Sequence, residues 1–168
     1  MDEHDRFAEF ARVRTPALIR AAYLLTGDQH AAEDLVQSAL TKTYARWGRV
    51  RHEDPEAYVR TAMYREQVSW WRRRSRQRQL APTWATPERQ ADPADHTGLR
   101  LAMQEALLQL PQPQRAVIVL RYYEDLSETQ VAEILGCSVG TVRSRANRAV
   151  HRLRASLPAF EPLLEVRA

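Results

Sequence analysis

The fold is constrained most strongly by a pattern in the last third of the chain. Two residues that can start a helix, Ser127 and Ser138, lie on either side of a short helical segment that ends at Gly136. Ser127 to Gln130 has the pattern of a capping box, in which a serine hydroxyl accepts from the amide three residues later and a glutamine side chain reaches back. Gly136 supplies the left-handed residue that ends this short helix, and Ser138 can cap the next one. Because so short a turn forces the two helices to cross, the sequence predicts a helix-turn-helix from Leu126 to Arg154.

The second helix of this motif carries apolar residues on one side and small, polar or basic residues on the other. At about 100° per residue, the apolar side is formed by Val142, Ala146, Ala149, Val150 and Leu153. The cap, the opposite side and its flanks hold the candidate DNA contacts Ser138, Gly140, Thr141, Arg143, Ser144, Arg145, Asn147 and Arg148. Small groups allow close approach to the major groove, where arginines bind phosphates or guanine edges. We therefore expect a DNA recognition helix, the alternative being the solvated face of an ordinary helical hairpin.

The N-terminal half has the same helical periodicity, and strand-like alternation is absent from the chain. An apolar stripe from Phe7 to Leu25 stops at Gly27, and Asp28 can cap a second helix that runs to about Trp47. The expected inner face of that helix consists of Ala32, Leu35, Val36, Ala39, Leu40 and Tyr44. A polar loop is expected from Gly48 to Pro55, followed by a third long helix that begins near Pro55.

The composition changes at about Gln77, where three prolines (Pro82, Pro87 and Pro93) replace the apolar periodicity. Helical patterning resumes from Leu99 to Leu110 and again from about Pro113 to Tyr122, and two more helices follow through Leu157. The expected fold is therefore all-α, with two small helical domains, 1–78 and 99–158, the second a helix-turn-helix. We expect residues 79–98 to form a flexible linker between them and residues 159–168 to form a tail too short for an added regulatory domain.

The third helix combines arginines with aromatic residues, and five of the seven residues from Arg72 to Arg78 are arginine. Aromatic rings among arginines can stack exposed bases while the charges hold the nucleic-acid backbone. The candidate contacts are Arg60, Tyr64, Arg65, Trp70, Arg72, Arg73 and Arg74. The alternative is that the aromatic residues belong to the core and that the arginines form a solvated helix end.

A polar, locally acidic face lies opposite the apolar side of the second helix and contains Glu33, Asp34, Gln37, Ser38 and Thr41. Periodicity shows only that this face is exposed. Whether it binds a protein partner stays open on these residues alone.

Composition narrows the remaining function classes. The single cysteine, Cys137, excludes an intramolecular disulfide and a cysteine-rich zinc site, and the five histidines lack metal-ligand spacing. No nucleophile–base pair or glycine-rich phosphate loop is present, so we expect no enzyme and no cofactor. No signal peptide and no apolar stretch of ~20 residues is found, so the expected location is the cytoplasm, without a membrane partner.

These residues resemble the extracytoplasmic-function sigma factors of the sigma-70 family over about Phe7 to Leu157. The second domain resembles the family through LPQPQRAVIVLRYYEDLSETQVAEILGCSVGTVRSRANRAVHRLR. The first resembles it through GDQHAAEDLVQSALTKTYARW and PEAYVRTAMYREQVSWWRRRSR, the latter closest to a short actinobacterial subgroup. The resemblance implies a dissociable subunit of bacterial RNA polymerase that selects promoters.

Within that family, the helix holding Asp34 and Gln37, here with Ser38 and Thr41, docks on the clamp helices of the largest polymerase subunit. The following loop and the helix from Tyr58 to Arg74 read and melt the −10 element. The linker runs toward the active-site channel, and the recognition helix reads the −35 element while its domain contacts the flap of the second-largest subunit. An anti-sigma protein often holds family members inactive, which adds a further expected partner.

Two positions in the −10 helix depart from the family pattern. Arg65 stands where asparagine is frequent, and Ser69 stands where aspartate is frequent. Base-specific contacts in this helix are therefore not assigned from the resemblance.

Three other function classes compete with this interpretation. A stand-alone helix-turn-helix regulator explains Leu126 to Arg154 equally well, but leaves the arginine–tryptophan helix without a role. An enzyme lacks a recognisable site, and a helical adaptor leaves both basic surfaces unexplained.

Overall fold

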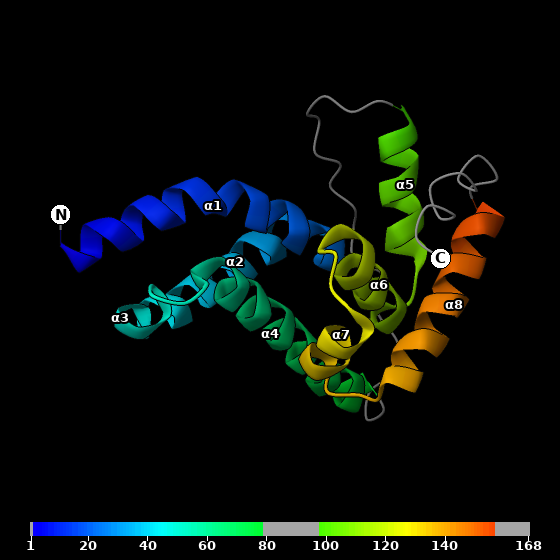
Figure 1. The fold of residues 1–168 in the computed structure, drawn as a ribbon. Helices are drawn as coiled ribbons and strands as arrows, with labels where there is room; N and C mark the ends of the chain where they lie inside the picture. The colour runs from blue at the N-terminus through cyan, green and yellow to red at the C-terminus, as the bar shows by residue number, and fades with distance from the viewer. Residues whose placement is uncertain (1, 79–97, 157–168) are drawn as a thin grey trace. The chain divides into compact units, whose positions relative to one another are not determined.

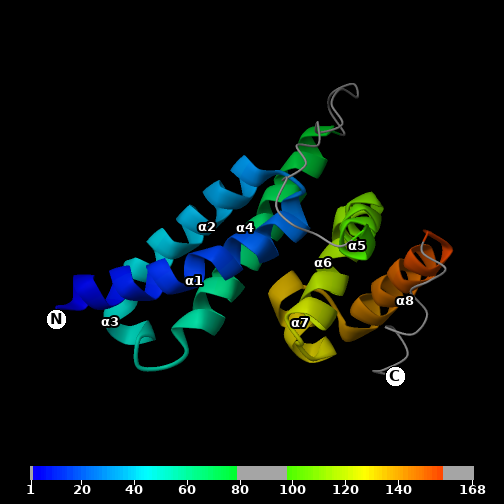
Figure 2. The ribbon, with the colours of Figure 1, turned by 90° about the horizontal axis from the view of Figure 1, so that it is seen from above.

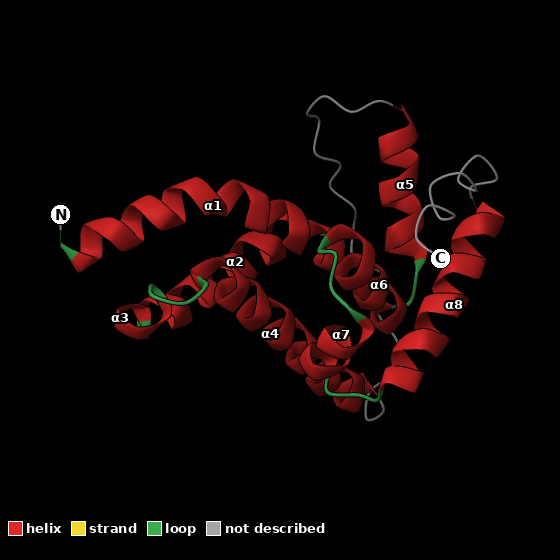
Figure 3. Ribbon diagram, in the orientation of Figure 1, coloured by secondary structure: helices red, strands yellow, loops and turns green. Residues whose placement is uncertain are grey.

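The computed structural model describes residues 2–78 and 98–156, and within these ranges it contains helices and loops but no strand (Figure 3). The helices are α1 (Glu3–Thr26), α2 (Gln29–Tyr44), α3 (Trp47–Val50), α4 (Pro55–Arg78), α5 (Gly98–Gln109), α6 (Gln112–Ile118), a π-helical turn η1 (Val119–Tyr123), α7 (Glu128–Leu135) and α8 (Val139–Ser156). The predicted all-α class is confirmed. The expected linker, apart from Gly98, and the expected tail lie outside the described residues.

The chain divides into two compact units, Met1–Gln90 and Ala91–Ala168. The first contains α1 to α4 and the second contains α5 to α8 (Figure 1).

In the first unit, α2 packs against both α1 and α4 (Figure 2). Alanines at the contact let the helices approach closely, and Ala21, Ala22, Ala32 and Ala39 are all fully buried. The predicted boundary between α1 and α2 is confirmed: Gly27 has φ 70°, and the Asp28 carboxylate accepts from the amide of Ala31 at 2.7 Å.

The segment after α2 differs from the polar loop expected from Gly48 to Pro55. The second helix ends at Tyr44, and α3 carries the buried side chains of Trp47 and Val50. The Trp47 ring lies 5.1 Å from the Phe7 ring and 5.2 Å from the Phe10 ring, centroid to centroid. These aromatic contacts bury the Trp47 side chain and fix the segment after α2 against α1. Tyr44, expected on the inner face of α2, is 47% exposed, although its ring packs on the Phe7 ring with 4.8 Å between the centroids.

In the second unit, α6 and α7 both pack against α8. The single helix expected from Pro113 to Tyr122 is α6 followed by η1. Arg115 is buried, and its guanidinium donates to the carbonyls of Leu107 and Leu110, both at 3.1 Å. Those carbonyls lie at and just after the end of α5, where helical hydrogen bonding stops, so Arg115 supplies donors to the end of that helix.

Candidate nucleic-acid interfaces

The turn between α7 and α8 has the predicted cap geometry. The Ser127 hydroxyl accepts from the amide of Gln130 at 3.2 Å, and the Gln130 side-chain oxygen accepts from the amide of Ser127 at 2.9 Å. Gly136 ends α7 with φ 60°, and the Ser138 hydroxyl accepts from the amide of Thr141 at 3.1 Å. The helix-turn-helix is thus fixed by local hydrogen bonds at both helix starts.

The two sides of α8 separate as the periodicity predicts. Val142, Ala149 and Leu153 are buried against the unit, whereas Ala146 and Val150 are half-buried. Most of the candidate DNA contacts are exposed: Ser138, Gly140, Arg143, Ser144, Asn147 and Arg148. Thr141 and Arg145, placed at the flanks, are half-buried. The outward side of α8 therefore presents small, polar and basic groups along one stripe.

Gly140 shows why this stripe is suited to close contact. A Cβ atom at this position would meet only the Ser138 hydroxyl oxygen, at 3.8 Å. The fold therefore has room for a side chain here and does not itself require glycine. A missing side chain on the exposed side of a helix leaves space for another molecule to approach the backbone.

An ion pair that the sequence did not predict joins the two helices of the motif. The Arg143 Nε donates to the Glu128 carboxylate at 2.7 Å, across 15 positions of the chain. Glu128 is the first residue of α7, so only the crossing of α7 and α8 brings it beside α8. Sequence spacing carries no signal for such a pair.

In the first unit, α4 also has an exposed basic side. Val59, Met63, Gln67 and Trp71 are buried at helical spacing. Arg65, Ser69, Arg72, Arg73 and Arg76 are exposed at the complementary positions. Arg60 lies apart from this side and pairs with Glu56 at 2.9 Å.

Tyr64 corrects one assignment. Its side chain is only 1% exposed, so its ring belongs to the core and cannot stack a base in this structure. The sequence did not separate Tyr64 from the exposed face, because its burial depends on the packing of α4 against other helices.

The two adjacent tryptophans of α4 have different environments. Trp71 is 8% exposed and packs into the core, whereas Trp70 is 40% exposed. The Arg74 guanidinium carbon lies 4.9 Å from the centroid of the Trp70 ring system. This distance is typical of a cation–π contact. Of the two, only Trp70 presents an aromatic ring beside the arginines.

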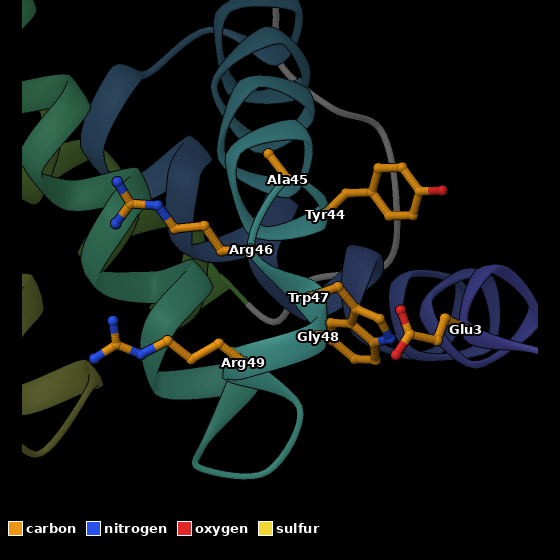
Figure 4. Close-up of a pocket in the computed structure, with 7 residues that line it drawn as sticks. All are labelled: Glu3, Tyr44, Ala45, Arg46, Trp47, Gly48 and Arg49. Carbon is orange, nitrogen blue, oxygen red and sulfur yellow. The ribbon is translucent and has the colours of Figure 1, made fainter.

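A pocket opens at the corner where α2 meets α3, beside the start of α1 (Figure 4). Arg46 and Arg49 extend to one side of this corner, and Tyr44 extends to the other. The Arg46 guanidinium donates to the Tyr58 hydroxyl of α4 at 3.3 Å. The corner thus adds two arginines near the beginning of α4, Arg46 from the end of the expected second helix and Arg49 from the expected polar loop.

The polar face of α2 is only partly available to a partner. Asp34 and Gln37 are exposed, and their side chains have no partner among the described residues. The Thr41 hydroxyl, in contrast, donates to the carbonyl of Gln37 at 2.9 Å. The Ser38 hydroxyl donates to the Glu66 carboxylate at 2.7 Å, and Lys42 pairs with the same carboxylate at 2.9 Å. Glu66 therefore ties this face to α4, and the Glu33 carboxylate accepts from the Gln29 side chain at 2.7 Å. Among the five described residues of this face, Asp34 and Gln37 are the two whose side chains are unengaged.

Residues 2–78 and 98–156 contain no cluster of three or more metal-ligating side chains. None of the helices described there is long and apolar enough to span a membrane.

Comparison with known proteins gives matches in both units. The family model for Sigma-70 region 2 matches residues 12–77, and the model for Sigma-70, region 4 matches residues 100–153. An RNA polymerase sigma-E factor of Streptomyces coelicolor is 38% identical, over 100% of this chain and 94% of the relative. The ECF RNA polymerase sigma factor SigL of Mycobacterium tuberculosis is 35% identical over 83% of this chain and 82% of its own.

A solved structure agrees with these matches. It is the sigma factor RpoE in complex with the anti-sigma factor NepR from Bartonella quintana, which superposes with a TM-score of 0.72. The two chains are 31% identical, and the match covers 91% of this chain and 97% of the other.

Proposed function

This chain belongs to the ECF group of the sigma-70 family, and we propose how its surfaces serve promoter-specific transcription initiation. As a sigma factor it is a non-catalytic subunit that joins core RNA polymerase and selects promoters. The observation that carries the proposed division of roles is an exposed, arginine-rich helix side in each of the two matched units.

The outward side of α8 reads the −35 element in duplex DNA. Its exposed serines, glycine and asparagine permit close approach to base edges, and Arg143 and Arg148 supply guanine or phosphate contacts. Gly140 supports this role because nothing within the unit requires a glycine there.

The exposed side of α4 and the corner before it bind the −10 element. Arg65, Arg72 and Arg73 provide positive charge for the DNA backbone, and Trp70 provides a ring on which an unpaired base can stack. Arg46 and Arg49 extend this basic surface at the corner. Melting is favoured when single-stranded bases gain contacts that paired bases lack.

The exposed face of α2 binds core polymerase through Asp34 and Gln37. Both side chains are exposed and unengaged in the described part of the chain, as a docking contact requires. Ser38 and Thr41 contribute less, because their hydroxyls already donate within the unit.

The cellular setting follows from these partners. Since a sigma factor works on RNA polymerase, we place the protein in the bacterial cytoplasm. The structural neighbour was solved with an anti-sigma factor, so we propose an anti-sigma protein as a regulatory partner here as well.

A stand-alone helix-turn-helix regulator is the competing function. It would account for residues 100–153 but not for the region 2 match over residues 12–77, or for the basic side of α4. The two functions differ in whether the chain needs polymerase to act.

Reconstituted transcription separates them. Bacterial core RNA polymerase is combined with the full chain and a library of promoter-length duplexes, and the transcripts are sequenced. A sigma factor produces defined start sites only when chain and core are both present. Tight, sequence-selective duplex binding by the chain alone, with no effect on start sites, would support the stand-alone regulator instead.

A further inference from the structure

We infer that Glu128 is a positioning residue that fixes how Arg143 reads its base pair in the −35 element. The inference rests on the proposed function of α8 as the −35 reader. It concerns a residue of α7, outside the exposed stripe of the recognition helix.

The geometry of the pair restricts the guanidinium. Glu128 accepts from the Arg143 Nε at 2.7 Å, and the two terminal nitrogens of Arg143 have no partner among the described residues. An arginine can grip a guanine edge through both terminal nitrogens or through Nε and one of them. With Nε engaged by Glu128, only the end-on contact through both terminal nitrogens is left.

The pair also pre-orders a side chain that would otherwise be mobile. Arg143 is 65% exposed, and an exposed arginine of this kind has many rotamers to lose when it binds. Holding its Nε in the unbound chain lowers the entropy lost when the base contact forms. An exposed ion pair contributes little to folding stability, so the consequence of this pair lies in binding.

The carboxylate has the opposite effect on non-specific affinity. A carboxylate paired with a DNA-contacting arginine offsets part of its positive charge and so opposes phosphate binding at any sequence. Glu128 should therefore lower overall affinity while raising discrimination between base pairs, which is how specificity is gained at the expense of affinity. Loss of Glu128 should therefore raise overall DNA affinity and lower discrimination between base pairs. Loss of a residue with a purely structural role would not change the two in opposite directions.

The test uses the full chain in reconstituted holoenzyme and a promoter library with a randomised −35 segment. Arg143→Ala first identifies the base pair that loses its preference. We expect Glu128→Ala to reduce discrimination at that same base pair about fivefold, within the range of a single bidentate contact. The holoenzyme should bind poorly matched promoters more strongly. The thermal unfolding midpoint should fall by a few degrees at most, because an acidic residue in the first turn of a helix contributes only modestly to stability.

Two further variants and one control sharpen the comparison. Glu128→Gln keeps an acceptor oxygen and should restore most of the discrimination, though a neutral acceptor is weaker. Adding Glu128→Ala to Arg143→Ala should change discrimination no further, because the two residues act through one contact. Glu133→Ala removes an exposed carboxylate from the same helix that has no partner in the described ranges, and should leave base preference unchanged.

The possible failures are distinguishable. If Glu128→Ala shifts all sequences by one common factor, or leaves the preference intact, the positioning role is wrong while the −35 assignment stands. If the unchanged chain selects no −35 sequence, the proposed function of α8 fails, and this inference fails with it.

Discussion

Replacing Trp70 or Trp71 with alanine should have opposite consequences, although the two residues are neighbours on α4. Trp70 is 40% exposed, and its contact with Arg74 is worth about 0.5–1 kcal/mol at an exposed site. Trp70→Ala should therefore cost about 1 kcal/mol of folding stability or less. Trp71 is 8% exposed, and a buried tryptophan reduced to alanine costs about 3–5 kcal/mol.

For DNA binding we expect Trp70→Ala, and not Trp71→Ala, to remove a direct contact. Stacking of one base on an aromatic ring is worth about 1–3 kcal/mol, which corresponds to about 5–150-fold in affinity. Trp70→Ala should lose this amount only where the −10 bases are unpaired. Trp70→Phe keeps a ring and should lose less.

The assay compares holoenzyme binding to a selected promoter as a duplex and as a fork whose −10 non-template bases are single-stranded. Thermal unfolding of each variant alone is measured in parallel. Trp70→Ala should weaken the fork complex far more than the duplex complex, with a nearly unchanged unfolding midpoint. Equal losses on the two DNAs, or no loss on the fork, would refute base stacking by Trp70.

Three further changes test the other surfaces. Asp34→Ala should weaken binding to core polymerase about thirtyfold, the effect of losing about 2 kcal/mol at an interface hot spot, in a titration of labelled chain with core. Glu33→Ala is the control, and equal losses in both would argue for a general charge effect. Ser127→Ala removes one half of the capping box and should lower the free energy of unfolding by about 1 kcal/mol. The melting point of the C-terminal unit should then fall by about 4–8 °C. An unchanged melting point would show that the cap is dispensable. Gly140→Ala should leave the free energy of unfolding unchanged or raise it by up to about 1 kcal/mol, yet reduce transcription from −35-dependent promoters. Full transcription would mean that DNA does not approach the backbone there.

The sequence predicted those features that depend on residues a few positions apart. Gly27, Asp28 and Ser127 act on amides or carbonyls within the same helix end, so their local pattern is sufficient. The two sides of α8 followed from helical periodicity, because its core residues repeat at regular spacing.

Features that depend on distant residues were missed or misassigned. The corner at Trp47 is helical because Phe7 and Phe10, far away in the chain, pack on its indole ring. Tyr64 lies in the core because α4 contacts α1, α2 and α3, and the periodicity of one helix side cannot represent contacts in several directions. Glu128 reaches Arg143 only after the two helices of the motif have crossed.

The sequence also could not show which polar side chains of α2 are free to bind a partner. Exposure distinguishes Asp34 and Gln37 from Ser38, whose hydroxyl is engaged by Glu66. No pattern along α2 indicates that difference, because it depends on the packing of α2 against α4.

The promoter sequence that the holoenzyme selects tests the central claim most directly. From a randomised library, wild-type chain with core polymerase should enrich two separate sequence blocks at a constant spacing upstream of one start site. Arg148→Ala should remove the preference at one base pair of the upstream block, whereas Arg154→Ala, which changes an exposed arginine nearer the end of α8, should leave the block unaltered. The double change Arg65→Ala and Arg73→Ala removes charge that faces the DNA backbone, so it should lower the yield from every selected promoter by about the same factor and leave the upstream block unaltered. A single enriched block, or one block altered by changes in both helices, would contradict two separate promoter-reading surfaces.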